Sequence, residues 1–141
     1  MAQIKETLQS AADDDRTVML VDDDPDHREL YSRRLARLGY SVTAIGDVDE
    51  AVRAVAERAP EAVILDIAMP GRDGVSVLQE LIALRPTLPV IIHTAYPGFR
   101  DNFLTWAAEA FVQKSTDLRP LAAALSAVTS SSRSRCSRLR A

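Results

Sequence analysis

The chain is organised around residues 62–74, which read AVILDIAMPGRDG. Four apolar residues lead directly into Asp66, and the turn formers Pro70, Gly71 and Gly74 follow. A short uninterrupted apolar run is typical of a strand buried on both faces of a parallel sheet. Asp66 is therefore expected at the carboxyl end of a central strand, which is the edge of an open α/β sheet where ligands bind. Taken alone, an Asp at this place fits a capping residue as well as a nucleophile or metal ligand.

A second apolar run with an acidic end lies nearer the N-terminus. Residues 18–21 (VMLV) are followed by Asp22, Asp23, Asp24 and Pro25. Two buried strands that both end in carboxylates bring like charges together, which disfavours ionisation unless a cation compensates. Mg²⁺ fits better than Ca²⁺, because it keeps several waters and takes only one or two carboxylates. The sequence therefore predicts a magnesium site.

The composition indicates one domain and excludes several classes of protein. A length of 141 residues suffices for a single domain with a core, and a net charge of −3 gives no overall nucleic-acid signature. The single cysteine, Cys136, excludes a framework of intrachain disulfides and suits a reducing cytosol. No apolar run reaches membrane-spanning length, and the N-terminus lacks the apolar region of a signal peptide. We expect a cytoplasmic protein without a membrane partner.

The apolar periodicity predicts five strands that alternate with five helices. The strands are expected at residues 18–21, 41–45, 62–65, 90–94 and 111–113. Helices are expected after the capping residues Asp24, Asp47 and Asp73, after Ser115 or Thr116, and, as a short segment, within residues 102–108. Such alternation implies an α/β fold with helices on both faces of a five-stranded parallel sheet.

Polar side chains gather at the carboxyl ends of these predicted strands. They are Asp22, Asp23, Asp66, Thr94 and Lys114. The chain has only two lysines, Lys5 and Lys114, among its 17 basic residues. A lysine ammonium binds phosphate as a point charge, so its place beside carboxylates favours a phosphoryl site. A plain salt bridge between Lys114 and Asp66 is the simpler interpretation, and the two are compatible in the resting protein.

The motifs that contain these residues resemble the receiver domain of two-component response regulators, the CheY-like family. In chain order they are VDDDP at 21–25, LDIAMPGRDG at 65–74, HTA at 93–95 and FVQK at 111–114. The resemblance covers about residues 17–128. It implies a flavodoxin-like sheet with strand order 2-1-3-4-5. It also implies a phosphoacceptor, not an enzyme beyond self-phosphorylation from a donor and self-dephosphorylation.

The resemblance implies a nucleophile, a metal site and partners. Asp66 would accept a phosphoryl group from a histidine kinase or a phosphotransfer protein. Mg²⁺ would be bound by Asp23, Asp66 and the backbone carbonyl of Ala68, with Asp22 acting through water. The phosphorylated protein would then signal by contact with a downstream protein that the sequence does not identify.

The resemblance also implies a switch. Thr94 and Lys114 would contact the phosphoryl oxygens, and Phe111 would change rotamer on activation. Two features depart from the family or vary within it. Ser115 follows Lys114 where the family often has a proline, and Ala68 and Tyr96 stand at the two positions that tune how quickly the phosphoryl group is lost.

The ends of the chain lack apolar periodicity. Residues 1–16 are predicted to form a polar extension, residues 17–129 the receiver domain, and residues 130–141 a disordered Ser/Arg-rich tail. No output domain follows Val128 in this sequence, so a stand-alone receiver or a phosphorelay intermediate is expected.

Three alternatives stay open at this point. A haloacid-dehalogenase-type phosphatase also uses a strand-end Asp, but it needs an acid at the position of Ala68. A docking or adaptor module with a receiver fold would act without phosphorylation. Nucleic acid is not expected as a partner, although the arginines of residues 130–141 could contact phosphates.

Overall fold

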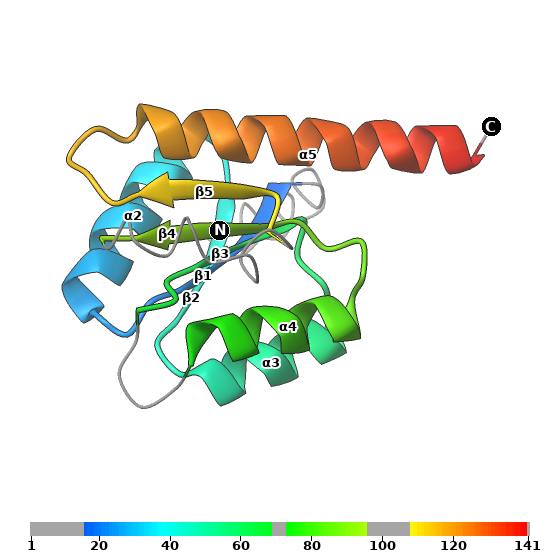
Figure 1. Ribbon diagram of the computed structural model, residues 1–141. Helices are drawn as coiled ribbons and strands as arrows, with labels where there is room; N and C mark the ends of the chain where they lie inside the picture. The colour runs from blue at the N-terminus through cyan, green and yellow to red at the C-terminus, as the bar shows by residue number, and fades with distance from the viewer. Residues whose placement is uncertain (1–15, 69–72, 96–107, 141) are drawn as a thin grey trace, which may run out of the picture.

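The computed structural model describes residues 16–68, 73–95 and 108–140. Within these ranges the chain forms a parallel five-stranded sheet in the order β2-β1-β3-β4-β5 (Figure 1). The strands are β1 (Thr17–Val21), β2 (Ser41–Ile45), β3 (Ala62–Leu65), β4 (Val90–Thr94) and β5 (Ala110–Gln113). The predicted fold class and strand order are confirmed.

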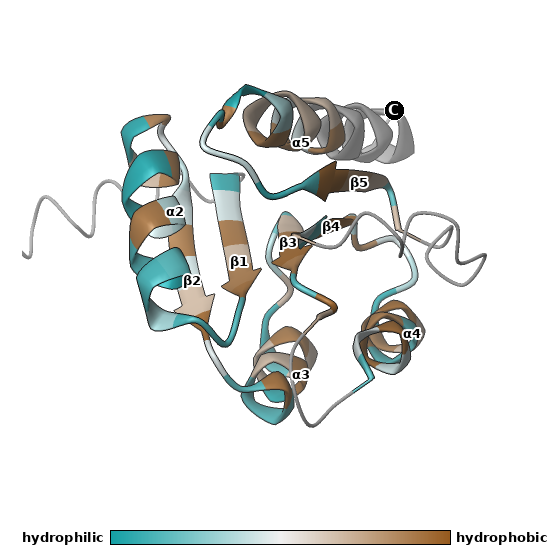
Figure 2. Cartoon of the chain, turned by 60° about the vertical axis from the view of Figure 1, so that its left-hand side comes forward, coloured by the Kyte–Doolittle hydropathy of each residue, from teal (hydrophilic) through white to brown (hydrophobic). Residues whose placement is uncertain are grey.

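The described helices cover both faces of the sheet. They are α2 (Pro25–Arg37), α3 (Val48–Glu57), α4 (Gly74–Leu84) and α5 (Arg119–Arg140). The helices α2 and α5 lie on one face, and α3 and α4 lie on the other (Figures 1 and 2). None of these helices is long and apolar enough to cross a membrane.

Each face of the sheet is buried in its own core. In β1, Met19 and Val21 belong to the core beneath α3 and α4. Their neighbours Val18 and Leu20 belong to the core beneath α2 and α5. Successive side chains of a strand point to opposite faces, so a strand covered on both sides needs an unbroken apolar run. This explains why the apolar runs of the sequence located the central strands correctly.

The starts of three helices are confirmed. Asp24, Asp47 and Asp73 each precede a helix, and each carboxylate accepts a hydrogen bond from a backbone amide of the first turn. Pro25 occupies the first turn of α2, where its missing N–H is not needed. Gly39 follows α2 with a φ of 96°, a left-handed conformation that glycine adopts without a steric penalty.

The predicted start of the last helix is wrong. The helix α5 begins at Arg119, not after Ser115 or Thr116. The Asp117 carboxylate accepts a hydrogen bond of 3.0 Å from the Arg119 amide, and the Ser115 hydroxyl accepts one of 2.9 Å from the Asp117 amide. A short Ser-based turn therefore precedes the helix, and the acidic side chain takes the capping role.

The helix α5 continues through Arg140. The predicted disorder of the Ser/Arg-rich tail, residues 130–141, stays a prediction. Leu121, Leu125 and Val128 bury the first part of α5 against the sheet. Once this packing has formed the costly first turns, each further residue adds a hydrogen bond at low cost. The short helix predicted within residues 102–108 lies almost entirely outside the described residues.

The start of α4 packs closely against the segment that follows β3. A Cβ added at Gly74 would lie 2.3 Å from the Cα atom and from the carbonyl oxygen of Ile67. Because both contacts are with backbone, no rotamer change could relieve them. The close approach fixes the path of the chain just after Asp66.

We predict that Gly74→Ala destabilises the fold by about 1–3 kcal/mol, because the new methyl group overpacks a backbone contact. Urea unfolding measures the change, with Ser76→Ala at an exposed position of α4 as the matched control. The control should stay within about 0.5 kcal/mol of the parent. Equal unfolding midpoints for the two variants would contradict the packing argument.

A histidine is buried beneath α2. The His93 side chain is 3% exposed, and its ring meets the Tyr31 ring edge-on with 4.7 Å between centroids. Its Nδ1 atom has no hydrogen-bond partner among the described residues. Burial, and to a smaller degree the positive charge of Lys114, lowers the pKa of His93 from 6.5 to about 4. Folding therefore requires the neutral imidazole.

This lowered pKa predicts an acid-sensitive core. Below about pH 6.5 the unfolded chain binds a proton that folded His93 rejects, so stability falls as the pH drops from about 6.5 toward 4. We expect His93 to remove about 2 kcal/mol of stability between pH 7 and pH 5. Urea unfolding at both pH values should show this loss for the parent and less of it for His93→Phe. The same pH dependence in both proteins would exclude His93 as the cause.

Candidate functional site

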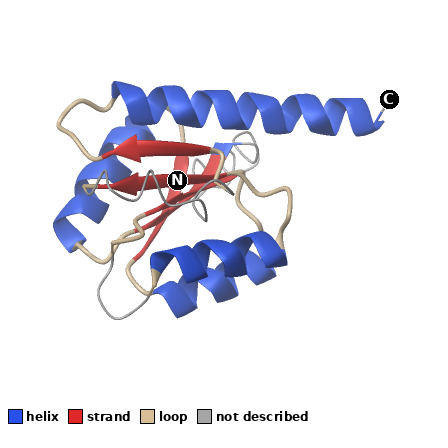
Figure 3. Cartoon of the chain, viewed as in Figure 1, coloured by secondary structure: helices blue, strands red, loops and turns tan. Residues whose placement is uncertain are grey.

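The candidate site lies at the carboxyl ends of four neighbouring strands. Asp22 and Asp23 follow β1, Asp66 follows β3, Thr94 ends β4, and Lys114 follows β5. Because the strands are parallel, their carboxyl ends meet at one edge of the sheet, and the arrows of β4 and β5 in Figure 3 show this common direction. The structure therefore brings together the residues that the sequence placed at strand ends.

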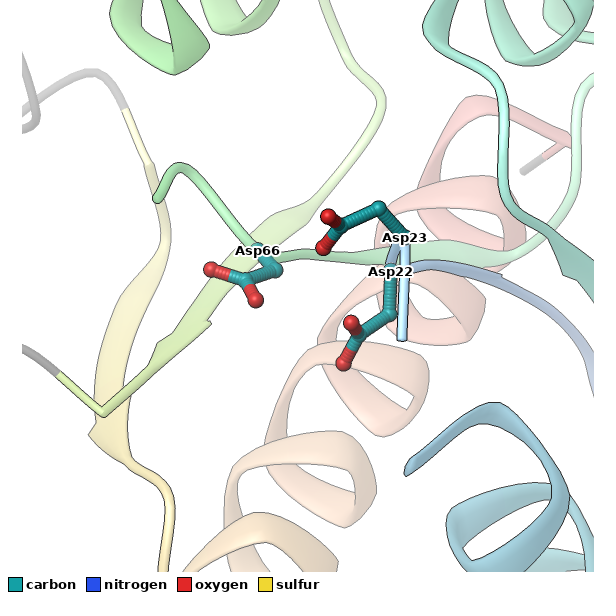
Figure 4. Close-up of side chains that lie close together, drawn as sticks. All are labelled: Asp22, Asp23 and Asp66. Carbon is teal, nitrogen blue, oxygen red and sulfur yellow. The ribbon is translucent and has the colours of Figure 1, made fainter. Parts of the chain in front are cut away.

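Three carboxylates converge at this edge (Figure 4). One oxygen from each of Asp22, Asp23 and Asp66 lies within 4.8 Å of the other two. Asp22 and Asp66 are buried, with exposed fractions of 1% and 7%, whereas Asp23 is open to solvent. Two buried carboxylates beside a third one form a strongly negative site.

The donor set fits a magnesium ion. Mg²⁺ prefers oxygen ligands at about 2.1 Å, so opposite ligands of its octahedron lie about 4.2 Å apart. Carboxylate oxygens within 4.8 Å of one another need only small rotations to share such an ion. The exposure of Asp23 leaves the site open to the waters that Mg²⁺ retains.

Lys114 neutralises part of this charge. Its ammonium donates hydrogen bonds of 2.6 Å to Asp22 Oδ2 and 2.9 Å to Asp66 Oδ2. Its side chain is only 8% exposed. Burial alone would lower the pKa of Lys114, but the hydrogen bonds and charges of Asp22 and Asp66 outweigh burial and raise it. The predicted salt bridge to Asp66 is confirmed, and the structure adds a second one to Asp22.

Backbone contacts hold the two buried carboxylates in place. Asp22 Oδ1 accepts a hydrogen bond of 3.0 Å from the Asp24 amide, and the Asp22 carbonyl accepts one of 2.8 Å from the Arg28 guanidinium. Asp66 Oδ1 accepts a hydrogen bond of 2.9 Å from the Ala68 amide. Each carboxylate therefore turns one oxygen to the backbone and the other to Lys114. The predicted role of the Ala68 carbonyl as a metal ligand stays a prediction.

The loop that carries Lys114 is anchored on both sides. The Lys114 amide donates a hydrogen bond of 2.7 Å to the Thr94 carbonyl, which extends the pairing of β4 with β5. The Arg34 guanidinium of α2 donates one of 3.2 Å to the Thr116 carbonyl. The described residues contain no cis peptide bond, so the Lys114–Ser115 bond is trans. These contacts hold the loop without the proline that is common in the family.

The two residues predicted to form the switch lie on neighbouring strands and the same face. Thr94 is fully buried, and Phe111 is half-buried against the core beneath α3 and α4. In β4, Val90 and Ile92 also belong to this core, so the alternation of side chains directs Thr94 to the same face. Their movement on activation stays a prediction.

One contact of the site was missed from the sequence. The Nδ1 atom of His27, which belongs to none of the motifs, lies 3.0 Å from Lys114 Nζ. The first turn of α2 follows β1 directly and therefore lies above the strand ends. The short connection between β1 and α2 can be read from the sequence, so a position of His27 near the strand ends could have been predicted. Tyr96, one of the two predicted tuning positions, and residues 69–72 of the second motif lie outside the described residues.

Comparison with known proteins agrees with this geometry. A model of the response regulator receiver domain family matches residues 18–126. The probable transcriptional regulatory protein TcrX of Mycobacterium tuberculosis is 35% identical over 70% of this chain and 43% of its own length. The DNA-binding transcriptional regulator NtrC of Salmonella typhimurium is 36% identical over 73% of this chain and 21% of its own length. The chain thus spans less than half of either relative.

Solved structures show the same fold. The response regulator protein TrrA of Thermotoga maritima, in complex with Mg²⁺-BeF, is 31% identical with a TM-score of 0.77. The match covers 80% of this chain and 98% of TrrA. TrrA was also crystallised with the histidine kinase ThkA, and that structure matches 80% of this chain and 97% of its own chain, with 31% identity and a TM-score of 0.76.

The carboxylate cluster predicts weak Mg²⁺ binding that depends on Asp23. We expect Asp23→Asn to raise the Mg²⁺ dissociation constant at least roughly tenfold, because it removes one charged ligand of the cluster. Asp26→Asn, which removes an exposed carboxylate from the first turn of α2, is the matched control and should leave the constant unchanged. Calorimetric titration measures both. Equal affinities for the two variants would place the ion elsewhere.

Proposed function

The chain belongs to the receiver domain family of two-component response regulators, and on that premise we propose that Asp66 accepts a phosphoryl group from a histidine kinase or a phosphotransfer protein. A receiver domain is a phosphoacceptor in signal transduction, not an enzyme in the ordinary sense. The observation that carries the proposal is the environment of Asp66. Its carboxylate is held by the ammonium of Lys114 at 2.9 Å and lies beside Asp22 and Asp23.

The proposed reaction is a transfer between phosphohistidine and a carboxylate. An oxygen of Asp66 attacks phosphorus, the P–N bond to the donor imidazole breaks, and an acyl phosphate forms on Asp66. Negative charge gathers on the equatorial phosphoryl oxygens in such a transfer. Lys114 meets that charge with a positioned ammonium, and bound Mg²⁺ would supply further neutralisation of the same oxygens. Asp23, Asp66 and the Ala68 carbonyl are the proposed ligands of that ion, with Asp22 acting through water.

The proposed output is a packing change at the sheet edge. Phosphorylation adds a charge of about −1.5 to −2 and strong acceptor oxygens beside Asp66. The Thr94 hydroxyl and the Lys114 ammonium would turn toward these oxygens, and Phe111 would fill the space that Thr94 leaves. The shared face of Thr94 and Phe111 supports this coupling.

The proposed partners are proteins of the cytoplasm. The structure of TrrA with the histidine kinase ThkA supports a kinase as the phosphoryl donor for this chain. The downstream target is a protein that would recognise the changed surface near Phe111.

We predict that Asp66 is the phosphorylated residue, because its carboxylate ends the central strand within reach of Lys114 and the carboxylate cluster. Incubation with acetyl phosphate and Mg²⁺ should add one phosphoryl group to the wild-type protein, and intact-mass spectrometry measures this. Asp66→Asn should stay unlabelled, whereas the control Asp26→Asn should be labelled as the parent is.

Two outcomes would overturn the assignment. Equal labelling of Asp66→Asn would move the phosphorylation site to another residue. A wild-type protein that no small donor and no histidine kinase labels would favour the alternative, a docking module with a receiver fold that acts without phosphorylation.

A further inference from the structure

His27 makes a contact that the proposed transfer does not use. Its Nδ1 atom lies 3.0 Å from Lys114 Nζ. An ammonium carries three N–H donors and no lone pair, so Nδ1 accepts the hydrogen bond and the ring proton resides on Nε2. Together with Asp22 Oδ2 at 2.6 Å and Asp66 Oδ2 at 2.9 Å, His27 gives the ammonium one acceptor for each of its donors.

The three acceptors of Lys114 differ in what the proposed reaction does to them. Asp22 and Asp66 belong to the carboxylate cluster, and Asp66 is the proposed nucleophile. Phosphorylation of Asp66 changes the charge and position of the oxygens that face Lys114. His27 is neutral when it accepts from an ammonium, and it lies outside the carboxylate cluster. Phosphorylation of Asp66 therefore leaves the His27 acceptor itself chemically unchanged.

The His27 ring is held by its place on α2. The Asp24 carboxylate caps the helix and accepts hydrogen bonds from the amides of Asp26 and His27. The ring meets Tyr31 at an angle of 63° with 6.0 Å between centroids. Tyr31 is buried and packs in turn on His93. The His27 side chain is 41% exposed, so burial in the core does not explain its orientation toward Lys114.

We propose that His27 is a positioning residue for phosphoryl transfer, whose Nδ1 atom orients the Lys114 ammonium toward the incoming phosphoryl oxygens. One donor of the ammonium stays on His27 while another turns from Asp66 to the phosphoryl group. The kinetic part of this proposal rests on the proposed function of Asp66, whereas the hydrogen bond belongs to the resting protein.

Two substitutions separate the acceptor of His27 from its ring. His27→Asn keeps an acceptor, because Asn Oδ1 stands the same number of bonds from Cα as His Nδ1, but it loses the ring. His27→Phe keeps a ring against Tyr31 but has no acceptor. If the acceptor matters, His27→Phe should lower the maximal rate of labelling by acetyl phosphate roughly three- to tenfold, and His27→Asn should restore most of it. Mg²⁺ affinity should be the same in all three proteins.

Nuclear magnetic resonance tests the hydrogen bond without any phosphorylation. The chain has two lysines, so lysine labelled with ¹⁵N gives two side-chain signals, and Lys5→Arg identifies the one from Lys114. At about pH 8, where histidine is ordinarily neutral, the Lys114 ammonium protons should exchange slowly in the parent and in His27→Asn and faster in His27→Phe. Histidine labelled with ¹⁵N should show His27 as the Nε2–H tautomer.

The outcomes distinguish this inference from the proposed function. An unchanged Lys114 signal in His27→Phe, or an Nδ1–H tautomer of His27, would show that the hydrogen bond is absent and would overturn the inference. Equal labelling rates in the parent and His27→Phe would overturn the role of the Nδ1 acceptor in the transfer. A loss in His27→Asn alone would then assign the effect to the ring. Absence of labelling in the wild-type protein would instead refute the function proposed for Asp66.

Discussion

The structure depends on one buried ammonium between two buried carboxylates. Asp22 and Asp66 lie at adjacent strand ends with almost no access to water, and Lys114 joins them with hydrogen bonds of 2.6 and 2.9 Å. Removing one partner of such a buried ionic group typically costs about 3–5 kcal/mol, because the remaining charge loses its compensation. The three carboxylates of the cluster and the ammonium carry a formal net charge of −2, which a divalent cation balances. The same arrangement that needs Lys114 for stability thus leaves a carboxylate cluster of the kind that is typical of Mg²⁺ sites.

The parallel sheet explains why these charges can meet at all. The strands β3 and β4 begin with unbroken apolar runs and are buried along their length, so polar groups are tolerated only toward their carboxyl ends. In β4 the last two residues show how the two faces are used. His93 points beneath α2, where its imidazole must stay neutral, whereas Thr94 lies on the face that Phe111 shares. The two faces of the sheet therefore differ at this edge: one buries a neutral imidazole, and the other carries Thr94 and Phe111.

Much of the fold and of the site could be predicted from the sequence, because the signals are local. An apolar run of four residues followed by Asp marks β1 and β3 and the group at the end of each, and the shorter apolar run at residues 111–112 marks β5 just before Lys114. Asp24, Asp47 and Asp73 mark helix starts because a carboxylate next to the first turn satisfies its free amides. Parallel pairing then brings the ends of β1, β3, β4 and β5 to one edge, whatever the length of the connections. The magnesium-type cluster follows from that topology.

The tertiary structure alone decided which groups touch across long sequence separations. The sequence placed Lys114 near Asp66, but it did not show that Asp22 provides the shorter contact or that His27 supplies a third acceptor. Nor did it show that Arg34 holds the Lys114 loop, or that α5 begins at Arg119 and continues through residues 130–140. The contacts of His27 and Arg34 depend on the angle at which α2 crosses the sheet. The bounds of α5 depend on how its apolar residues pack against the sheet. Sequence periodicity specifies which face of an element is buried, whereas distances between side chains on different elements follow only from how those elements pack.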